Sequence, residues 1–186
     1  MRCPYCQTLL QASVVECTAC RLSYPRTCTL LGAVPRLAPL LADTTHTLHS
    51  AEHARIKRRI TSIQRRFPQL VPQVVMHAFP AQHPFSMHVF WLFNAVDLAG
   101  SSHRGSANHS LMLAIDPDRG EAAIIPGYGL ETFLTEDMLQ RLLDLAAPPW
   151  AENRWTDGII RVLDGLDAML ETVAVSEPPG VGEGDY

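Results

Sequence analysis

The chain has 186 residues and a formal net charge of −4, and 47% of its residues are hydrophobic and 18% charged. These values suit one folded domain with a small appendage, and they exclude a collagen, a coiled coil and a chain disordered throughout. No apolar run approaches the roughly 18 to 20 residues that span a bilayer, and the first residues lack the apolar stretch of a signal peptide. We therefore expect no transmembrane segment and a cytoplasmic location.

The small net charge conceals two segments of opposite charge. Residues 1–66 contain ten Lys and Arg against three Asp and Glu, whereas residues 67–186 contain five against sixteen. These counts predict a molecule with a basic and an acidic end. They leave open whether the basic side chains contact nucleic acid or cover a solvated helix face, and the second interpretation is favoured.

Four of the five cysteines lie within the first twenty residues, in two Cys-x2-Cys pairs separated by ten residues. Two such pairs can place four thiolates about 2.3 Å from one tetrahedral zinc ion. A segment of about 20 residues buries too little apolar surface to fold alone, and a structural Zn²⁺ supplies the missing free energy. Metal-free thiols or a redox-active pair are the alternative. The spacing predicts a small zinc ribbon with the ligands Cys3, Cys6, Cys17 and Cys20.

The fifth cysteine, Cys28, has no partner at this spacing. It can replace Cys20 as a ligand or remain a free thiol in a linker, and the second interpretation is favoured. A site closed by four thiolates keeps no position open for water or substrate, which indicates a structural zinc. A ribbon of this kind predicts docking on a protein or a nucleic acid.

The elements after the cysteines are predicted from periodicity. Residues 25–42 contain three prolines and no clear period, which predicts a linker. With Ser50 as the N-cap, apolar residues at i, i+4, i+7 and i+11 predict an amphipathic helix over 50–67. A β-rich run predicts the first strand at 74–79, and helical spacing predicts a helix over 85–96.

The second half of the chain predicts a hairpin and two helices. Apolar runs at 111–115 and 122–125 flank the turn sequence Asp-Pro-Asp-Arg-Gly-Glu, and they predict antiparallel strands. A helix beginning after Thr135 is expected to end at the pair Pro148-Pro149, and the last helix covers 155–173. This order predicts an α/β fold with a mixed β-sheet flanked by helices. The predicted domains are a zinc ribbon at 1–24, a linker at 25–42, an α/β domain at 43–174 and a disordered tail at 175–186.

Three stretches carry a likeness to a known family. They are the segment Leu111 to Arg119, the sequence Gly-Tyr-Gly-Leu-Glu at 127–131, and Pro-Trp followed by Trp-Thr-Asp-Gly-Ile within 149–159. Together they resemble the TPM domain family, named for a thylakoid lumen phosphatase, a photosystem II repair protein and a receptor-modulating membrane protein. The resemblance covers roughly residues 43–172. It implies a mixed α/β fold and, for some members, acid phosphatase activity or calcium binding, whereas other members resemble assembly or interaction modules.

The glycines around Tyr128 permit a positive φ or a close backbone approach, and they leave that side chain displayed at one end of the sheet. A structural turn with Tyr128 packed as a wedge is the alternative. If the protein is a phosphatase, the catalytic candidates are Asp116, Tyr128 and Glu131. The predicted binding loop consists of Asn108, Gly127, Tyr128, Gly129 and Glu131.

One departure from the family pattern bears on metal binding. Where many members have Asp-Asn-Gly, this chain has Asn108-His109-Ser110, so an amide replaces a carboxylate. A Ca²⁺ or Mg²⁺ site prefers several charged oxygens, and the loss of one argues against a cation-dependent phosphatase. Other carboxylates can contribute, namely Asp97, Asp116 and Asp118, but the last two serve equally well as turn formers. The favoured function is a non-catalytic interaction or assembly module with a protein partner. The alternatives are a phosphatase acting on phosphomonoesters and, third, a nucleic-acid-binding protein.

All eight histidines lie between His46 and His109. Their spacing does not predict a metal site, because the only helical pair at i, i+4 lacks the glutamate that a metalloprotease helix requires. We interpret them as structural residues. Candidates for acid–base chemistry near neutral pH are His83, His88, His103 and His109.

Overall fold

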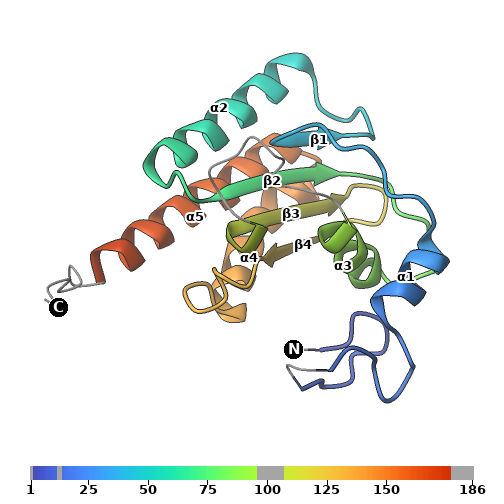
Figure 1. Cartoon of the computed structure of the whole chain (residues 1–186). Coiled ribbons are helices and arrows are strands. Elements are labelled where there is room, and N and C mark those ends of the chain that lie inside the picture. The colour runs from blue at the N-terminus through green and yellow to red at the C-terminus, as the bar shows by residue number, and fades with distance from the viewer. Residues whose placement is uncertain (1, 12–13, 96–106, 177–186) are drawn as a thin grey trace, which may run out of the picture.

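The computed structural model describes every residue except 1, 12–13, 96–106 and 177–186. Figure 1 shows a sheet with helices on both sides and the cysteine-bearing segment at one corner. None of the described helices combines the length and hydropathy that crossing a bilayer requires. The elements are α1 (Tyr24–Leu31), β1 (Leu41–Asp43), α2 (Ser50–Arg66), β2 (Val71–Met76), α3 (Phe85–Ala95), a 3-10 turn (Ala107–His109), β3 (Ser110–Asp116), β4 (Glu121–Pro126), α4 (Glu136–Ala151) and α5 (Trp155–Ser176).

The strands lie in the order β1-β2-β3-β4. The first three are parallel, and β4 runs antiparallel to β3 as the second arm of the predicted hairpin. The predicted mixed sheet flanked by helices is confirmed. The three-residue strand β1 was not predicted, because so short a run shows no alternation.

Strand β2 begins at Val71, three residues before its predicted start. The N–H of Val74 faces β1, where it donates to the Leu40 carbonyl at 2.8 Å, and Pro72 faces the same side two residues earlier. Because β1 pairs only with residues 74–76, none of the described strands offers a hydrogen-bond acceptor opposite Pro72 on this side. The missing N–H therefore costs the sheet nothing.

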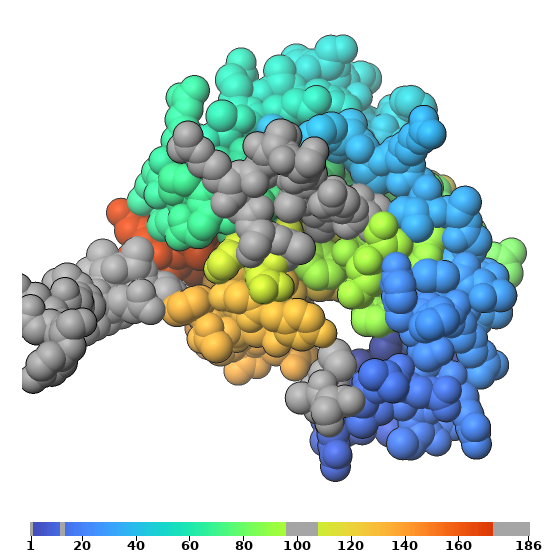
Figure 2. Space-filling model, viewed as in Figure 1, coloured from blue at the N-terminus to red at the C-terminus, as the bar shows by residue number. Residues whose placement is uncertain are grey.

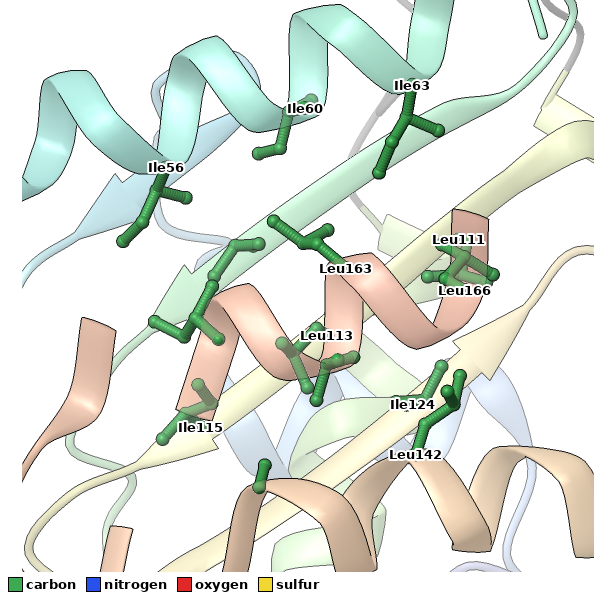
Figure 3. Close-up of a cluster of buried hydrophobic side chains, with 14 of the residues drawn as sticks. Ile56, Ile60, Ile63, Leu111, Leu113, Ile115, Ile124, Leu142, Leu163 and Leu166 are labelled. Atoms are coloured by element: carbon green, nitrogen blue, oxygen red, sulfur yellow. The ribbon is translucent and has the colours of Figure 1, made fainter. Parts of the chain in front are cut away.

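Alternate side chains of β3 form two separate cores. Leu111, Leu113 and Ile115 pack with α2, α4 and α5, whereas Met112 and Ala114 pack with α3 and its neighbours. Figure 3 shows the buried isoleucines of α2 and leucines of α5 converging on the first face. Because the chain crosses the sheet in one direction while α2 and α3 cover opposite faces, its two parallel crossovers have opposite hands.

The helix predicted at 50–67 is confirmed as α2, but its N-cap is His49 instead of Ser50. Glu52 Oε2 accepts from the His49 N–H at 2.8 Å, which forms half of a capping box. The other oxygen, Oε1, accepts from the Thr156 hydroxyl at 2.8 Å. Both bonds lower the pKa of Glu52, and the bond from the His49 backbone has the larger effect. The bond with Thr156 also ties the start of α2 to α5.

Ion pairs join the basic helix α2 to the acidic helix α5. Arg59 contacts Asp164 at 2.6 Å and Asp167 at 2.9 Å, and Arg66 contacts Asp167 at 2.6 Å and Glu171 at 3.0 Å. Asp167 is 7% exposed, so its two pairs lie at the edge of the core. The opposite charges of the two halves of the sequence therefore meet at one interface, and the expected separation into a basic and an acidic end is wrong in this respect.

A helix occupies part of the predicted linker. In α1, Pro25 lies in the first turn, where a missing N–H is tolerated, and the buried Thr27 hydroxyl donates to the Ser23 carbonyl at 2.9 Å. Eight residues are too few to show a helical period. Cys28 lies in this helix and packs against the α3 core, away from the other four cysteines.

Helix α4 continues through the proline pair that was expected to end it, as far as Ala151. Pro149 cannot donate to the carbonyl four residues earlier. That carbonyl, of Leu145, accepts instead from Arg161 Nη1 of α5 at 3.3 Å. The contact with Arg161 thus satisfies the carbonyl that the proline leaves without a helical donor. No local sequence pattern predicts such a contact.

Replacing Asp43 by asparagine is expected to destabilise the domain at neutral pH. Burial alone would raise the pKa of Asp43, but hydrogen bonds from the Thr45 hydroxyl and from nearby backbone N–H groups, including that of Leu48, hold it below its usual value. A lowered carboxyl pKa stabilises the fold above the unfolded pKa near 4, and this contribution is lost as the pH falls. Urea titrations should show a cost of about 2 kcal/mol at pH 7 that decreases as the pH falls below 4; a cost that does not change with pH would contradict it.

Candidate metal centre and binding cleft

Four thiols converge at the base of the N-terminal segment. The Sγ atoms of Cys3 and Cys20 are 3.6 Å apart, as are those of Cys6 and Cys17, and all four lie within 4.8 Å of one another. A tetrahedral ion with bonds of about 2.3 Å requires sulfur atoms about 3.8 Å apart. The cluster can therefore hold a metal ion and is consistent with a small zinc ribbon. Among the described residues it is the one group of potential metal ligands with such geometry.

The two Cys-x2-Cys pairs have the same backbone geometry. In the first, Gln7 N–H donates to the Cys3 carbonyl at 3.0 Å, and in the second Arg21 N–H donates to the Cys17 carbonyl at 2.9 Å. Gln7 and Arg21 both adopt a φ of 61°. Each pair thus closes through a residue in the left-handed region, which side chains other than glycine adopt at a cost.

Replacing Arg21 by glycine is expected to stabilise the metal-bound segment by roughly 1 kcal/mol, because glycine adopts its φ of 61° without strain. Gln7→Gly is a second test of the same geometry. Competition with a chelator should show slower metal loss from Arg21→Gly than from the wild type. Arg26→Gly, at a helical position of α1, is the control and should not slow the loss.

The thiols of the cluster differ in acidity. Hydrogen bonds from the side chain and backbone of Thr8 lower the pKa of Cys6 to about 6, whereas loss of hydration raises the pKa of Cys20 to about 12. Without a metal, one thiolate therefore forms near neutral pH, and it hinders ionisation of its neighbours. A bound dication favours four thiolates instead.

The N-terminal segment that contains the four clustered cysteines (residues 2–24, the cysteine segment) is docked on helix α3. Ser86 donates its hydroxyl proton to the Pro4 carbonyl at 2.6 Å, and the Tyr24 hydroxyl contacts the Asn94 carbonyl at 3.3 Å. Met87 is fully buried against Cys3 and Cys17. The segment is therefore packed on the α/β domain by both polar and apolar contacts.

A cleft of about 740 Å³ separates the cysteine segment from the outer strand of the sheet. Figure 2 shows a hollow there, between the N-terminal segment in blue and the parts of the main domain in orange. Its walls are mainly apolar: Leu10 and Val15 come from the segment between the cysteine pairs, Val89 from α3, and Ile125 from β4. Tyr128 lies at its rim and is 74% exposed. Val15 is 90% exposed, and no sequence pattern predicts its place at the cleft.

The Gly-Tyr-Gly loop is fixed by close backbone contacts. Gly127 N–H donates to the Ser110 carbonyl at 2.7 Å, and Gly129 N–H donates to the Asn108 carbonyl at 2.8 Å. A Cβ at Gly129 would lie 3.0 Å from both the Asn108 oxygen and Nε2 of His109. The backbone at Gly129 thus approaches its neighbours closely, as expected for one of the two uses of these glycines. Tyr128 is exposed and not packed as a wedge, so the alternative is wrong for this side chain, although the segment is a turn and Leu130 is buried in the core.

The predicted site residues do not gather at one end of the sheet. Asn108 and Tyr128 lie beside the first residue of β3, whereas Asp116 is its last, about 20 Å away at the usual rise per residue. Asp116 is fully buried, and its carboxylate accepts the N–H groups of Phe79, Asp118 and Arg119. It shapes the hairpin turn, as a turn-forming aspartate does.

The remaining candidates are dispersed. Glu131 is exposed in the turn after the Gly-Tyr-Gly loop. His83 and His88 lie at the other end of the sheet, near Asp116, in the loop after β2 and in α3. Asp97 and His103 lie outside the described residues. The geometry therefore brings the four cysteines together, and it separates the catalytic candidate Asp116 from Tyr128 and Glu131.

Comparison with known proteins agrees with this architecture. The N-terminal domain of a P. gingivalis protein is similar with a TM-score of 0.55 and 16% identity, over 75% of this chain and 95% of that one. The N-terminal domain of a Corynebacterium glutamicum protein gives 0.54 and 17%, over 83% and 97%. A protein from the psychrophilic bacterium Bizionia argentinensis gives 0.57 and 8%, over 70% and 86%. At these identities the likeness concerns the fold alone.

No curated protein sequence matches this chain significantly. A family profile does, over residues 41–169, and its description is the TPM domain. That span includes the whole sheet and most of α5. The chain belongs to the TPM domain family, and it carries an N-terminal four-cysteine cluster in addition to that domain.

Proposed function

We propose that this protein is a non-catalytic interaction module whose ribbon holds a structural Zn²⁺ and whose cleft binds an extended segment of a partner protein. Four sulfur ligands favour zinc over Ca²⁺ or Mg²⁺, which prefer oxygen. Because the ligands must stay reduced, we place the protein in the cytoplasm. The observation that carries the proposal is the apolar cleft between the ribbon and β4.

The cleft has the features of a protein-binding groove. It is bordered by exposed Val15 and Tyr128, and an aromatic side chain that presents both a ring and a hydroxyl is typical of interfaces. Among the described residues, its charged lining residues are Arg2 and Glu16, both on the ribbon. An apolar partner segment would therefore lose little hydration of charged groups on binding.

Strand β4 adds backbone groups to the same region. It is an edge strand, and the bond from Gly127 to Ser110 fixes the alternation of its hydrogen bonds. By this alternation, the N–H and C=O groups of Ala122 and Ile124 face away from β3. A partner segment can pair with them by strand addition, which gives affinity through the main chain. Pro126 limits the length of such a pairing.

The phosphatase alternative has weaker support. Phosphoryl transfer needs charged groups around one phosphate, yet Asp116 is buried far from Tyr128 and already accepts three N–H groups. The nucleic-acid alternative is weakened because Arg59 and Arg66 of the basic helix are paired with α5.

Photocrosslinking and an enzyme assay test the proposal together. A photoreactive phenylalanine analogue at Tyr128 should crosslink a discrete partner in cells, whereas the same analogue at Leu145, exposed on α4 outside the cleft, should not. Purified wild-type protein is also assayed with a chromogenic phosphomonoester, with and without Ca²⁺ or Mg²⁺. Its turnover should be no higher than that of the Glu131→Gln and Tyr128→Phe variants. Turnover abolished by either substitution, or equal crosslinking from both positions, would contradict the module.

A further inference from the structure

A second cavity, of about 380 Å³, lies apart from the cleft. It opens among the loop after β2, helix α3 and the end of α1, and His77, the residue after β2, lines it. In open sheets with parallel strands, ligands bind beyond the carboxyl ends of those strands. The cavity therefore occupies the position at which this class of fold holds small molecules.

Two residues that line this cavity each have a buried nitrogen atom without a partner among the described residues. Trp91 is 4% exposed, and its Nε1–H finds no acceptor there; Nδ1 of His83 is likewise buried without a partner. An indole N–H can only donate, and a buried donor without an acceptor is costly. A ligand that offers a hydrogen-bond acceptor would therefore satisfy the Trp91 Nε1–H.

Two further imidazoles line the cavity. His88 Nε2 lies 3.0 Å from the Pro80 carbonyl, which can only accept, so Nε2 carries the proton. His77 Nδ1 lies 2.6 Å from the Thr44 hydroxyl, which also contacts the Met76 carbonyl at 3.2 Å. Each neutral ring keeps one basic nitrogen, Nδ1 in the case of His88, that can take up a proton.

Charged groups around these rings determine what they can bind. Burial lowers the pKa of both His77 and His88, while Asp116 opposes this at His77, and His83, Arg119 and His77 add to it at His88. The carboxylate of Asp116 is already bonded to backbone N–H groups, and Arg119 Nη1 donates to the His83 carbonyl at 3.2 Å. An anion would favour protonation of the rings.

The cavity is unsuited to a metal ion and suited to an aromatic body. Among the described residues, its imidazoles do not form a group with metal-ligand spacing, and the indole N–H repels a cation. Phe79 lies 4.7 Å from the ring of His77 and 5.2 Å from that of His88, measured between centroids. These rings form flat, partly apolar walls.

From this combination of an unpaired buried N–H, basic imidazole nitrogens and aromatic walls, we propose that the cavity binds a small monocarboxylate with an aromatic or compact apolar body. The carboxylate accepts from Trp91 Nε1–H, and a protonated histidine balances its charge. Because an imidazole takes up a proton on binding, affinity increases as the pH falls from 8 to 6.

Benzoate is the probe, and the indole N–H resonances of the full-length protein are the readout. Benzoate should shift the Trp91 resonance and leave those of Trp150 and Trp155 in place, with binding several-fold tighter at pH 6 than at pH 8, because a rise of one unit in a histidine pKa changes affinity by at most about tenfold. Neutral benzamide should bind more weakly and without pH dependence. Inorganic phosphate should not compete.

Substitutions separate this site from the rest of the molecule. Trp91→Phe keeps an aromatic ring and removes the donor, and calorimetric titration, which needs no Trp91 resonance, should show benzoate binding at least tenfold weaker, whereas the control Trp155→Phe should not weaken it. If Trp91→Phe does not fold, His83→Gln is used with the same resonance as readout. An unshifted Trp91 resonance, unchanged affinity in Trp91→Phe, equal binding of benzamide, or tighter binding of phosphate would overturn the proposal.

Discussion

Replacing Cys17 by serine is expected to abolish stoichiometric metal binding and unfold the ribbon, while the α/β domain stays folded. The ribbon has few apolar contacts of its own, and metal binding supplies on the order of 10 kcal/mol in comparable sites. Elemental analysis should find about one equivalent of zinc in the wild type and less than half an equivalent in the variant. Amide resonances from residues 2–23 should collapse to unfolded positions, and those of the sheet should persist.

Cys28→Ser is the matched control. Cys28 lies in α1 and is not part of the four-thiol group, so this variant should keep its metal and its ribbon. Loss of the ribbon uncovers Met87, which is fully buried against it, and the main domain should lose about 1 to 3 kcal/mol of stability as a result. A Cys17→Ser protein with full metal content would contradict the assignment of ligands.

Replacing Gly158 by alanine is expected to destabilise the domain by about 3 kcal/mol, equivalent to a fall in melting temperature of about 10 °C. A Cβ at this position in α5 would overlap atoms Nε1 and Cδ1 of Trp150. The indole cannot move away freely, because its Nε1–H donates to the Trp155 carbonyl at 3.2 Å. Thermal and urea unfolding measure the loss.

Gly165→Ala is the control for the helix itself. Both glycines lie in α5, so both substitutions gain helix propensity of up to about 1 kcal/mol. At Gly165, the Cβ would meet Cδ2 of Leu142 at 2.5 Å, the end of a side chain that can rotate. Gly165→Ala should therefore cost much less than Gly158→Ala, and equal losses would show that the Trp150 contact does not matter.

Sequence patterns identified those parts of the fold that local chemistry determines. The apolar stripe of α2 and the turn sequence after Asp116 each predict their element, and Gly120 adopts the positive φ of 64° that such a turn uses. The spacing of the cysteines predicts a cluster because two short backbone turns bring each pair together. In these cases the residues that determine the structure are neighbours in the chain.

Other features depend on contacts between distant residues. The continuation of α4 past Pro149 depends on Arg161, and the position of Pro72 in β2 depends on how far β1 extends. The separation of Asp116 from Tyr128 follows from their places at opposite ends of the hairpin. No local pattern carries this information, so the predicted phosphatase site combined residues that the fold keeps apart.

The pairing of α2 with α5 has a consequence for biosynthesis. The ion pairs between them join residues 101 to 108 positions apart in the chain. During translation, α2 emerges before α5, so its arginines lack these partners and its isoleucines lack part of their core until α5 has been made. The domain can therefore close only after α5 has left the ribosome, and a chain truncated before Trp155 would leave part of the apolar side of α2 exposed to other proteins in the cell.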